Sequence, residues 1–163
     1  FATADFSSWP FVLPFLLFLI AFVGGCAGST GGGLKAIRVL LIYKHGLREV
    51  KRLIHPNAII PLKVGKKPVP AKVIEAVWGF FSVYLFVFVV LLLLVLATGL
   101  DQVTAWSAVG ATMNNLGPGL GEVSAHYGNI PDTAKWVLCF SMLMGRLEIF
   151  TLLILFTPSF WRM

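Results

Sequence analysis

Long apolar runs, separated by one basic stretch, dominate the pattern of this chain. Residues 6–34 and 76–100 contain no Asp, Glu, Lys or Arg, and a third apolar segment, 133–161, is interrupted near its middle by Arg146 and Glu148. A helix needs about 20 predominantly apolar residues to cross a bilayer. The pattern therefore predicts three membrane-spanning segments.

Composition supports this prediction. Of the 163 residues, 58% are hydrophobic and only 12% are charged, and the mean hydropathy is +0.87. A soluble globule of this size has no means of hiding so much apolar surface, and disorder needs the opposite composition. We predict an all-α membrane protein. Because the chain begins at Phe1 with no initiator Met and no basic leader, we also expect a fragment without a signal peptide.

The basic residues predict the orientation. Ten of the 13 Lys and Arg residues lie between Lys35 and Lys72, where Glu49 is the only acid. By the positive-inside rule this segment is cytoplasmic, and so is the C-terminus after three spans. The predicted outer connections agree, because they hold four acids and one base: Asp5, Asp101, Glu122, Asp132 and Lys135. We interpret residues 35–72 as a topology signal and a contact for membrane lipid, not as a nucleic-acid surface.

The connection between the second and third spans is unusually rich in glycine and asparagine. Residues 103–113 predict three turns of helix, with Trp106 as an interfacial anchor, which is enough to enter the bilayer but not to cross it. The sequence NNLGPGLG follows at residues 114–121. Irregular backbone at membrane depth is tolerated only in protein or along a water-filled cavity. The pattern alone supports two interpretations equally, a filter of cation-binding carbonyls and an ordinary outer turn.

A glycine cluster interrupts the first span. Residues 24–33 have the sequence GGCAGSTGGG, with six glycines in ten. Each glycine destabilises a helix interior by about 1 kcal/mol relative to alanine, so the helix is predicted to break here. A phosphate-binding loop is excluded because the last glycine precedes Leu-Lys and not Lys-Ser/Thr. We prefer a mobile segment lining a pathway, in which Ser29 and Thr30 satisfy freed backbone groups. Small-residue packing at Gly24 and Gly28 is the alternative.

The two charges in the third span need polar surroundings. A charge at the bilayer centre costs at least about 2.5 kcal/mol, so such residues face a bundle interior or an aqueous path. Residues two positions apart point to different sides of a helix, so each is predicted to have its own partner. We favour a functional role for Arg146 and a structural role for Glu148.

Five segments together resemble a known family: GGCAGSTGGGLKAIR, RLIHPNAIIPLKVG, EAVWGFFSVYLFVF, ATMNNLGPGLG and GRLEIFTLLILFTPSFWR. They closely resemble the C-terminal third of the bacterial Trk-type potassium uptake proteins (the TrkH/TrkG family of the Trk/Ktr/HKT group). That family consists of four helix–pore loop–helix repeats around one pore. The resemblance implies that this chain holds the second helix of one repeat plus one complete repeat.

The resemblance also implies a division of the chain. Residues 1–54 would hold the outer filter exit at Phe1–Asp5, the broken transmembrane helix with its glycine-rich gate loop, and a basic cytoplasmic helix end. Residues 55–74 would be a cytoplasmic linker, and residues 75–161 the complete helix–pore loop–helix repeat.

Site residues follow from the same resemblance. The K⁺-binding filter would be Asn114, Asn115, Leu116 and Gly117, with potassium held by the backbone carbonyls of Asn115 and Leu116. The gate loop beneath it would be Gly24, Gly25, Gly28, Ser29, Thr30, Gly31, Gly32 and Gly33. Arg146 would face the pore below the filter. The filter differs from the Thr-Val-Gly-Tyr-Gly of simple potassium channels, which leaves the stringency of K⁺ over Na⁺ open.

We therefore expect the pore-forming subunit of a potassium uptake system in the bacterial inner membrane, without enzymatic activity or a covalent cofactor. The resemblance implies a homodimer gated by a cytoplasmic nucleotide-binding regulatory subunit (TrkA-like), which would dock on residues 35–72. A membrane anchor or assembly subunit that does not transport is the alternative, although it leaves the polar loop unexplained. An intramembrane enzyme is disfavoured because His45, His55 and His126 all lie in connections outside the predicted spans.

Overall fold

One long apolar helix is the spine of the structure. The computed structural model describes residues 9–10, 12–26, 28–29, 31–58, 60–147, 149, 151, 154 and 161. Within these residues, helix α3 (Ala71–Leu96) is the one helix long and apolar enough to cross a membrane. It begins directly after Pro70, whose extended backbone suits a helix start. The helix therefore starts before the predicted span at 76–100 and before the predicted repeat boundary at residue 75.

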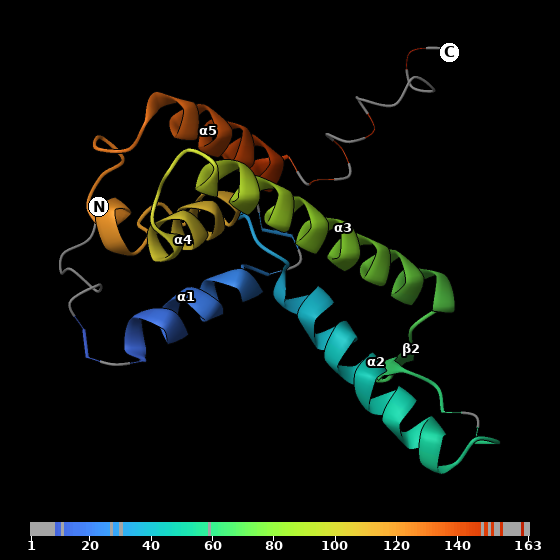
Figure 1. Ribbon diagram of the computed structural model, residues 1–163. Helices are drawn as coiled ribbons and strands as arrows, with labels where there is room; N and C mark the ends of the chain where they lie inside the picture. Colours follow the sequence, from blue (N-terminus) through green and yellow to red (C-terminus); the bar gives the residue numbers. More distant parts are fainter. Residues whose placement is uncertain are drawn as a thin grey trace.

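The first predicted span is a broken helix. Helix α1 (Leu13–Val23) has 11 residues, a rise of about 16 Å, and ends at Gly24, whose φ is +69°. Helix α2 (Ala36–Ile54) begins after the glycine-rich segment and departs in a new direction (Figure 1). The predicted break in the helix is confirmed. The rise of α1 equals about half the hydrocarbon thickness of a bilayer, so α1 alone is too short to cross one.

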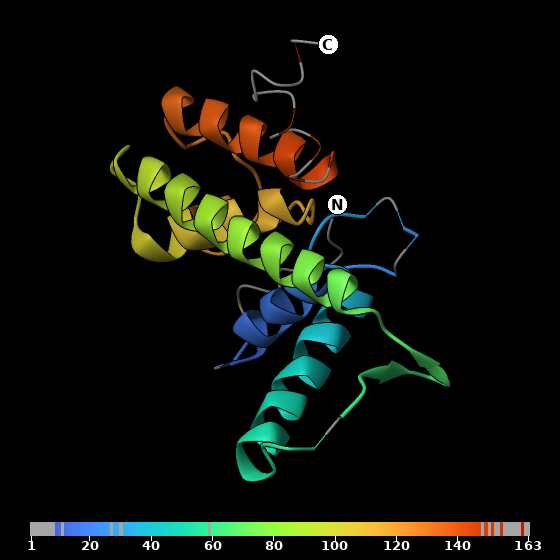
Figure 2. The same cartoon turned by 90° about the vertical axis from the view of Figure 1, so that its right-hand side faces the viewer.

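The basic segment is more regular than a plain linker. On helix α2, the side chains of Arg48 and Arg52 both form ion pairs with Glu49. The hydrogen bond from Arg48 lowers the pKa of the Glu49 carboxyl group. A hairpin follows, with strand β1 (Lys63–Val64) antiparallel to β2 (Lys67–Pro68). In both Figure 1 and Figure 2, α2 and the hairpin extend away from α4 and α5, while α2 contacts α3. His45 lies on α2, and its Nδ1 accepts a hydrogen bond from Trp78 of α3.

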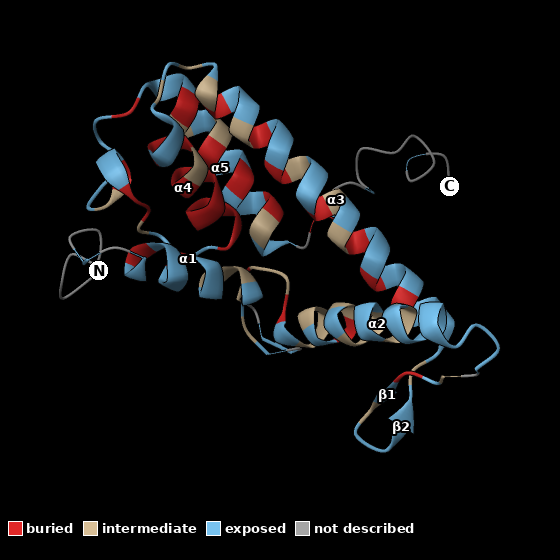
Figure 3. Cartoon of the chain, turned by 60° about the horizontal axis from the view of Figure 1, so that its bottom comes forward, coloured by how far each residue is buried: buried red, intermediate tan, exposed pale blue. Residues whose placement is uncertain are grey.

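A short helix is enclosed by the others. Helix α4 (Gln102–Met113) confirms the predicted helix at 103–113, and the Asp101 side chain caps it by accepting from the Val103 N–H at 3.1 Å. Helix α4 contacts α1, α3 and α5 (Asp132–Arg146), and the short 3-10 helix η2 (Gly121–Val123). It is buried along nearly its whole length, as Figure 3 shows. A short helix surrounded in this way suits the pore-helix interpretation better than an outer turn.

Aromatic packing joins α1 to α4. The Trp106 ring centroid lies 4.7 Å from that of Phe18 and 6.0 Å from that of Phe15. Phe18 is fully buried, because it packs where Gly110 of α4 has no side chain: a Cβ there would lie 2.6 Å from the Phe18 ring. Trp106 is half-buried against α1, and its role as an interfacial anchor stays a prediction. The indole is covered by α1 and serves helix packing.

Candidate functional site

The loop after α4 begins with a helix-terminating hydrogen-bond motif. The Leu116 N–H donates to the Ala111 carbonyl at 2.8 Å, and the Asn115 N–H donates to the Thr112 carbonyl at 3.1 Å. This pair of bonds is a Schellman motif, which requires a left-handed residue at its C′ position. Asn115 is that residue, with φ at +53°. Asparagine tolerates this conformation better than most residues. The left-handed backbone therefore explains why asparagine suits position 115.

A buried serine of α4 holds the returning chain. Ser107 is fully buried, and its Oγ accepts from the Leu120 N–H at 2.8 Å and lies 3.0 Å from the Leu120 carbonyl oxygen. Thr104 assists one turn earlier, where its Oγ1 accepts from the Glu122 N–H at 3.4 Å. The pore helix therefore fixes both ends of the loop, its start by backbone bonds and its return by hydroxyl groups.

Two tyrosines reach the predicted filter residues from outside the loop. The Tyr84 hydroxyl of α3 donates to Asn114 Oδ1 at 2.9 Å, and Asn114 Nδ2 donates to the Gly110 carbonyl at 2.8 Å. At the other end, the Tyr127 hydroxyl donates to the Gly117 carbonyl at 2.7 Å. Burial raises the pKa of Tyr127 to about 12, so it remains a donor at physiological pH. The Gly117 carbonyl is thereby oriented toward Tyr127.

The glycine-rich segment is a loop closed at its base. The Leu34 N–H donates to the Phe22 carbonyl at 3.1 Å, and the Ala36 N–H donates to the Gly25 carbonyl at 3.1 Å. At Gly24, a Cβ would lie 2.7 Å from the Gly32 carbonyl oxygen. The two backbone segments at the base of the loop therefore approach each other more closely than a side chain at Gly24 would allow. The tip is exposed at Gly28 and Ser29. Thr30, also predicted for this loop, lies outside the described residues.

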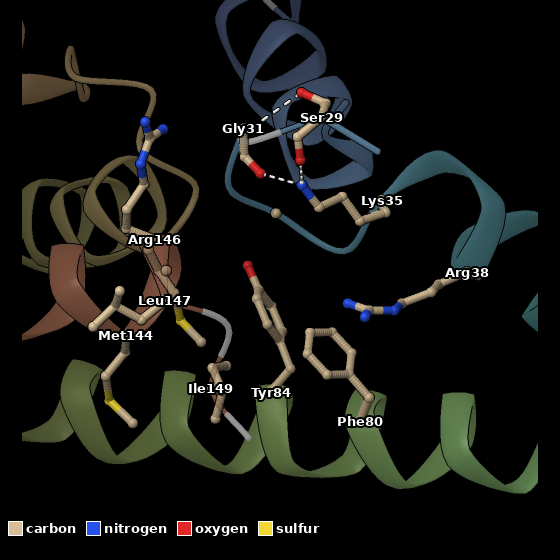
Figure 4. Close-up of a pocket in the computed structure, with 13 residues that line it drawn as sticks. Ser29, Gly31, Lys35, Arg38, Phe80, Tyr84, Met144, Arg146, Leu147 and Ile149 are labelled. Atoms are coloured by element: carbon tan, nitrogen blue, oxygen red, sulfur yellow. Dashed lines mark hydrogen bonds between the residues drawn. The ribbon is translucent and has the colours of Figure 1, made fainter. Parts of the chain in front are cut away.

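The loop is held internally by Ser29 and Lys35. The Gly31 N–H donates to Ser29 Oγ at 3.1 Å, as the prediction for Ser29 anticipated. The Lys35 ammonium donates to the backbone carbonyls of Ser29 and Gly31 (Figure 4). Lys35 is only 7% exposed. It is therefore part of the loop structure and does more than mark the cytoplasmic side.

The glycine-rich loop lies directly against the predicted filter. A Cβ on Gly32 would be 2.5 Å from the Asn114 carbonyl oxygen and 2.9 Å from Asn115 Nδ2. A Cβ on Gly33 would be 3.1 Å from Asn114 Oδ1. From α5, Gly145 makes a similar approach, with a Cβ position 2.1 Å from the Met113 carbonyl oxygen. Glycine is needed at these contacts because any side chain would displace backbone.

The comparisons with known proteins agree with this geometry. A family model described as TrkH, "Cation transport protein", matches residues 1–163. This chain belongs to the TrkH family. The resemblance and the fold class predicted from the sequence are thereby confirmed.

Individual TrkH-family relatives match over almost the whole chain. The Trk system potassium uptake protein TrkH of Halomonas elongata is 65% identical over 162 residues, which are 99% of this chain and 34% of the relative. TrkG of Escherichia coli K12 is 40% identical over 161 residues, 99% of this chain and 33% of the relative. The crystal structure of the potassium transporter TrkH from Vibrio parahaemolyticus superposes with a TM-score of 0.91 at 61% identity, over 99% of this chain and 35% of that one. This chain spans about a third of the length of these relatives.

A cavity of about 250 Å³ in this TrkH-family chain is bordered by the glycine-rich loop. Lys35, Tyr84 and Met113 line it, together with Arg146 at the end of α5. Figure 4 shows Arg146 on one side of the cavity and the Lys35–Ser29 contact on another. The structure thus brings the predicted gate loop and Arg146 to one space, which Tyr84, the partner of Asn114, also borders. Glu148 lies outside the described residues.

Several residues of this site escaped the sequence analysis. Tyr84 was detectable in principle, because a hydroxyl group in the middle of an apolar span needs a partner. Lys35 was interpreted only as the first base of the cytoplasmic segment. Gly145 and Tyr127 gave no signal, because their importance depends on contacts that only the folded chain forms, with Met113 and Gly117 respectively.

Proposed function

We propose that this chain is the C-terminal third of a potassium uptake protein and forms one side of its ion pathway. The main support is the direct contact of two loops, in which Gly32 of the glycine-rich loop lies against the Asn114 carbonyl at the start of the filter loop. A filter with a second loop at its inner end is the arrangement of a gated pore. Relatives named as potassium uptake proteins cover the same residues.

In this proposal K⁺ is bound by backbone carbonyls of the filter loop, chiefly those of Asn115 and Leu116. Both residues are exposed in this chain, as expected of a surface that faces a pore completed by other repeats. Carbonyl oxygens replace the hydration shell of a cation without adding a fixed charge. Gly24–Gly33 then obstructs the path on the cytoplasmic side, and its movement permits flux.

The proposed setting is the bacterial inner membrane, with the basic segment and the C-terminus in the cytoplasm. Residues 35–72 place exposed Lys and Arg side chains on α2 and the hairpin, away from the helices that hold the loops. This surface suits anionic lipid head groups and a cytoplasmic regulatory subunit of the TrkA-like, nucleotide-binding type. A homodimer of the full-length protein is part of the same proposal.

Flux measurements on the full-length protein test the proposal. Reconstituted into liposomes, it should admit K⁺ and Rb⁺ faster than Na⁺. Empty liposomes and the isolated 163-residue chain serve as controls, because one complete pore loop supplies only one of about four sides of a filter. A membrane anchor that does not transport, the alternative function, predicts no alkali-cation flux above the level of empty liposomes.

A further inference from the structure

The Lys35 ammonium group is hydrogen-bonded to two backbone carbonyl groups of the glycine-rich loop. It donates to Ser29 O at 2.5 Å and also to Gly31 O. Both acceptors belong to main chain and carry no net charge. Converging carbonyl oxygens are the ligands with which proteins bind dehydrated potassium ions, and ammonium and potassium ions have nearly equal radii. The same two carbonyls are therefore suited to a free monovalent cation.

The placement of Lys35 is unfavourable in three separate ways. Its φ is +69°, a left-handed conformation that costs a residue with a Cβ about 1–2 kcal/mol. It is the N-cap of α2, where the helix dipole disfavours a positive charge. It is also buried, which penalises an ammonium group that lacks partners. Such combinations persist where surrounding contacts compensate for them, and they concentrate at functional sites.

The position of this contact relates it to the ion path. Lys35, Ser29 and Gly31 line the same cavity as Tyr84, the residue bonded to Asn114. Figure 4 shows the lysine side chain extended toward the two carbonyls at the edge of that cavity. A cation leaving the filter on the cytoplasmic side would meet this place directly.

We infer that the carbonyls of Ser29 and Gly31 form a second monovalent-cation site, in which the Lys35 ammonium is a tethered competitor. The inference rests on the proposed role of the loop as a gate. While the ammonium is in place, it holds the loop in shape and excludes a permeating ion by charge. When the side chain withdraws, a cation of ammonium size (K⁺, Rb⁺ or NH₄⁺) takes its place, and the smaller Na⁺ fits less well.

The test uses Lys35→Met and Lys35→Ala in the full-length protein. Lys35→Met is expected to raise K⁺ flux per inserted molecule by roughly tenfold, because charge-assisted bonds that close the loop are lost. Lys35→Arg, which keeps the charge, should stay near wild type. Lys44→Met is the matched control, since the Lys44 ammonium also donates to a backbone carbonyl, that of Lys63 at 2.9 Å, but far from the cavity.

A second measurement detects the vacated site itself. In Lys35→Ala, propylammonium chloride should restore the missing group, raising the Tm and lowering the K⁺ flux toward wild type, because a ligand of the folded state stabilises it. N-methyl-D-glucamine chloride at equal ionic strength is the control salt. The variant should also gain a larger Tm increase in KCl than the wild-type protein does.

The outcomes separate this inference from the proposed function. The second cation site is refuted if Lys35→Met transports K⁺ at the wild-type rate and Lys35→Ala shows no Tm gain with propylammonium or K⁺. The proposed function as a pore is unaffected by that result. Absence of K⁺-selective flux in the wild-type protein contradicts the proposed function, and the amine-dependent Tm shift still decides whether the carbonyls bind a cation. If Lys35→Ala is too unstable to transport, that Tm shift again gives the answer.

Discussion

The Tyr84 hydroxyl donates a 2.9 Å hydrogen bond to the side-chain oxygen of Asn114, which joins the long helix α3 to the first residue of the proposed filter loop. Tyr84 is 5% exposed and Asn114 is 8% exposed, so water does not replace this bond easily. Asn114 is also the residue against which Gly32 and Gly33 lie. One residue thus connects α3, the loop after α4 and the glycine-rich loop, through its side chain and its backbone carbonyl.

Removing the Tyr84 hydroxyl should loosen the filter. In Tyr84→Phe the Asn114 oxygen remains buried without its donor, at a cost of about 1–3 kcal/mol. We expect the ratio of K⁺ to Na⁺ uptake to fall by roughly fivefold while the protein still inserts. Ion competition assays in liposomes measure the ratio. Tyr43→Phe is the control, because Tyr43 lies on the exposed face of α2, and equal ratios in the two variants would refute the role of Tyr84.

Gly32 should be the glycine of the loop least tolerant of a side chain. In Gly32→Ala the new methyl group would overlap the Asn114 carbonyl oxygen at 2.5 Å, so backbone has to move, at a cost of about 1–3 kcal/mol. We expect a lower Tm and a lower K⁺ to Na⁺ ratio.

Gly28→Ala supplies the matched control for this loop. A Cβ at Gly28 meets no heavy atom within 4 Å, so its Tm and ion selectivity should remain those of the wild-type protein. If Gly32→Ala behaves like Gly28→Ala, the loop does not press on the filter as the structure indicates.

Local patterns were enough to predict α4, the main part of α3 and the break between α1 and α2, but not the β1–β2 hairpin. The helix over 103–113, the break at 24–33 and the apolar span near 76–100 all follow from hydrophobic runs and glycine content, which act within one segment. The hydrogen bonds that complete the site are not encoded by a repeating pattern. Tyr84 and Asn114 are 30 residues apart, and their bond depends on how α3 packs against the loop after α4. Tyr127 and Gly117 are only 10 residues apart, but their bond depends on the irregular path of the connection that holds both. Periodicity therefore gave no indication of either pair.

The charged residues show the same limit. Lys35 and Arg146 were both recognised as charges, but their surroundings were not predictable. Lys35 was assigned to the cytoplasmic surface because it opens the basic segment, whereas the glycine-rich loop folds back over its ammonium. Arg146 was placed in the pore through family resemblance, and the cavity that it lines came only from the structure.

Gly117 should be sensitive to substitution through its backbone. Its φ is +103°, which disfavours any residue with a Cβ, although open space surrounds it. Gly117→Ser should therefore rotate the loop, disturb the carbonyl that accepts from Tyr127 and lower K⁺ to Na⁺ selectivity, at a cost of about 1–3 kcal/mol. Gly65→Ser is the control, since Gly65 also has a positive φ and open space but lies in the β1–β2 hairpin.

Shortening the glycine-rich loop should increase flux. Deleting residues 28–31 removes the tip and the acceptors of Lys35, while Gly24 and Gly33 at the closed base remain. We expect faster K⁺ uptake per inserted molecule, measured as ⁸⁶Rb⁺ entry and normalised to the amount of protein in the membrane. A variant that folds and inserts but transports no faster than wild type would contradict the assignment of this loop as the obstruction.

Arg146 should limit cation passage through its charge. It ends α5 and lines the cavity beside the glycine-rich loop, and a guanidinium stays protonated at any physiological pH. At about 10 Å and an effective dielectric constant of about 20, it repels a monovalent cation by about 1–2 kcal/mol. Arg146→Gln should therefore raise the maximal K⁺ uptake rate by up to roughly tenfold, whereas Arg146→Lys, which keeps the charge, should not.

The competing role of Arg146 is structural, because a cation in the last turn stabilises a helix C-terminus. This structural role predicts reduced membrane insertion of Arg146→Gln at unchanged flux per inserted molecule. Uptake rates divided by the amount of inserted protein distinguish the two roles, and wild-type values of both quantities in Arg146→Gln would exclude each of them.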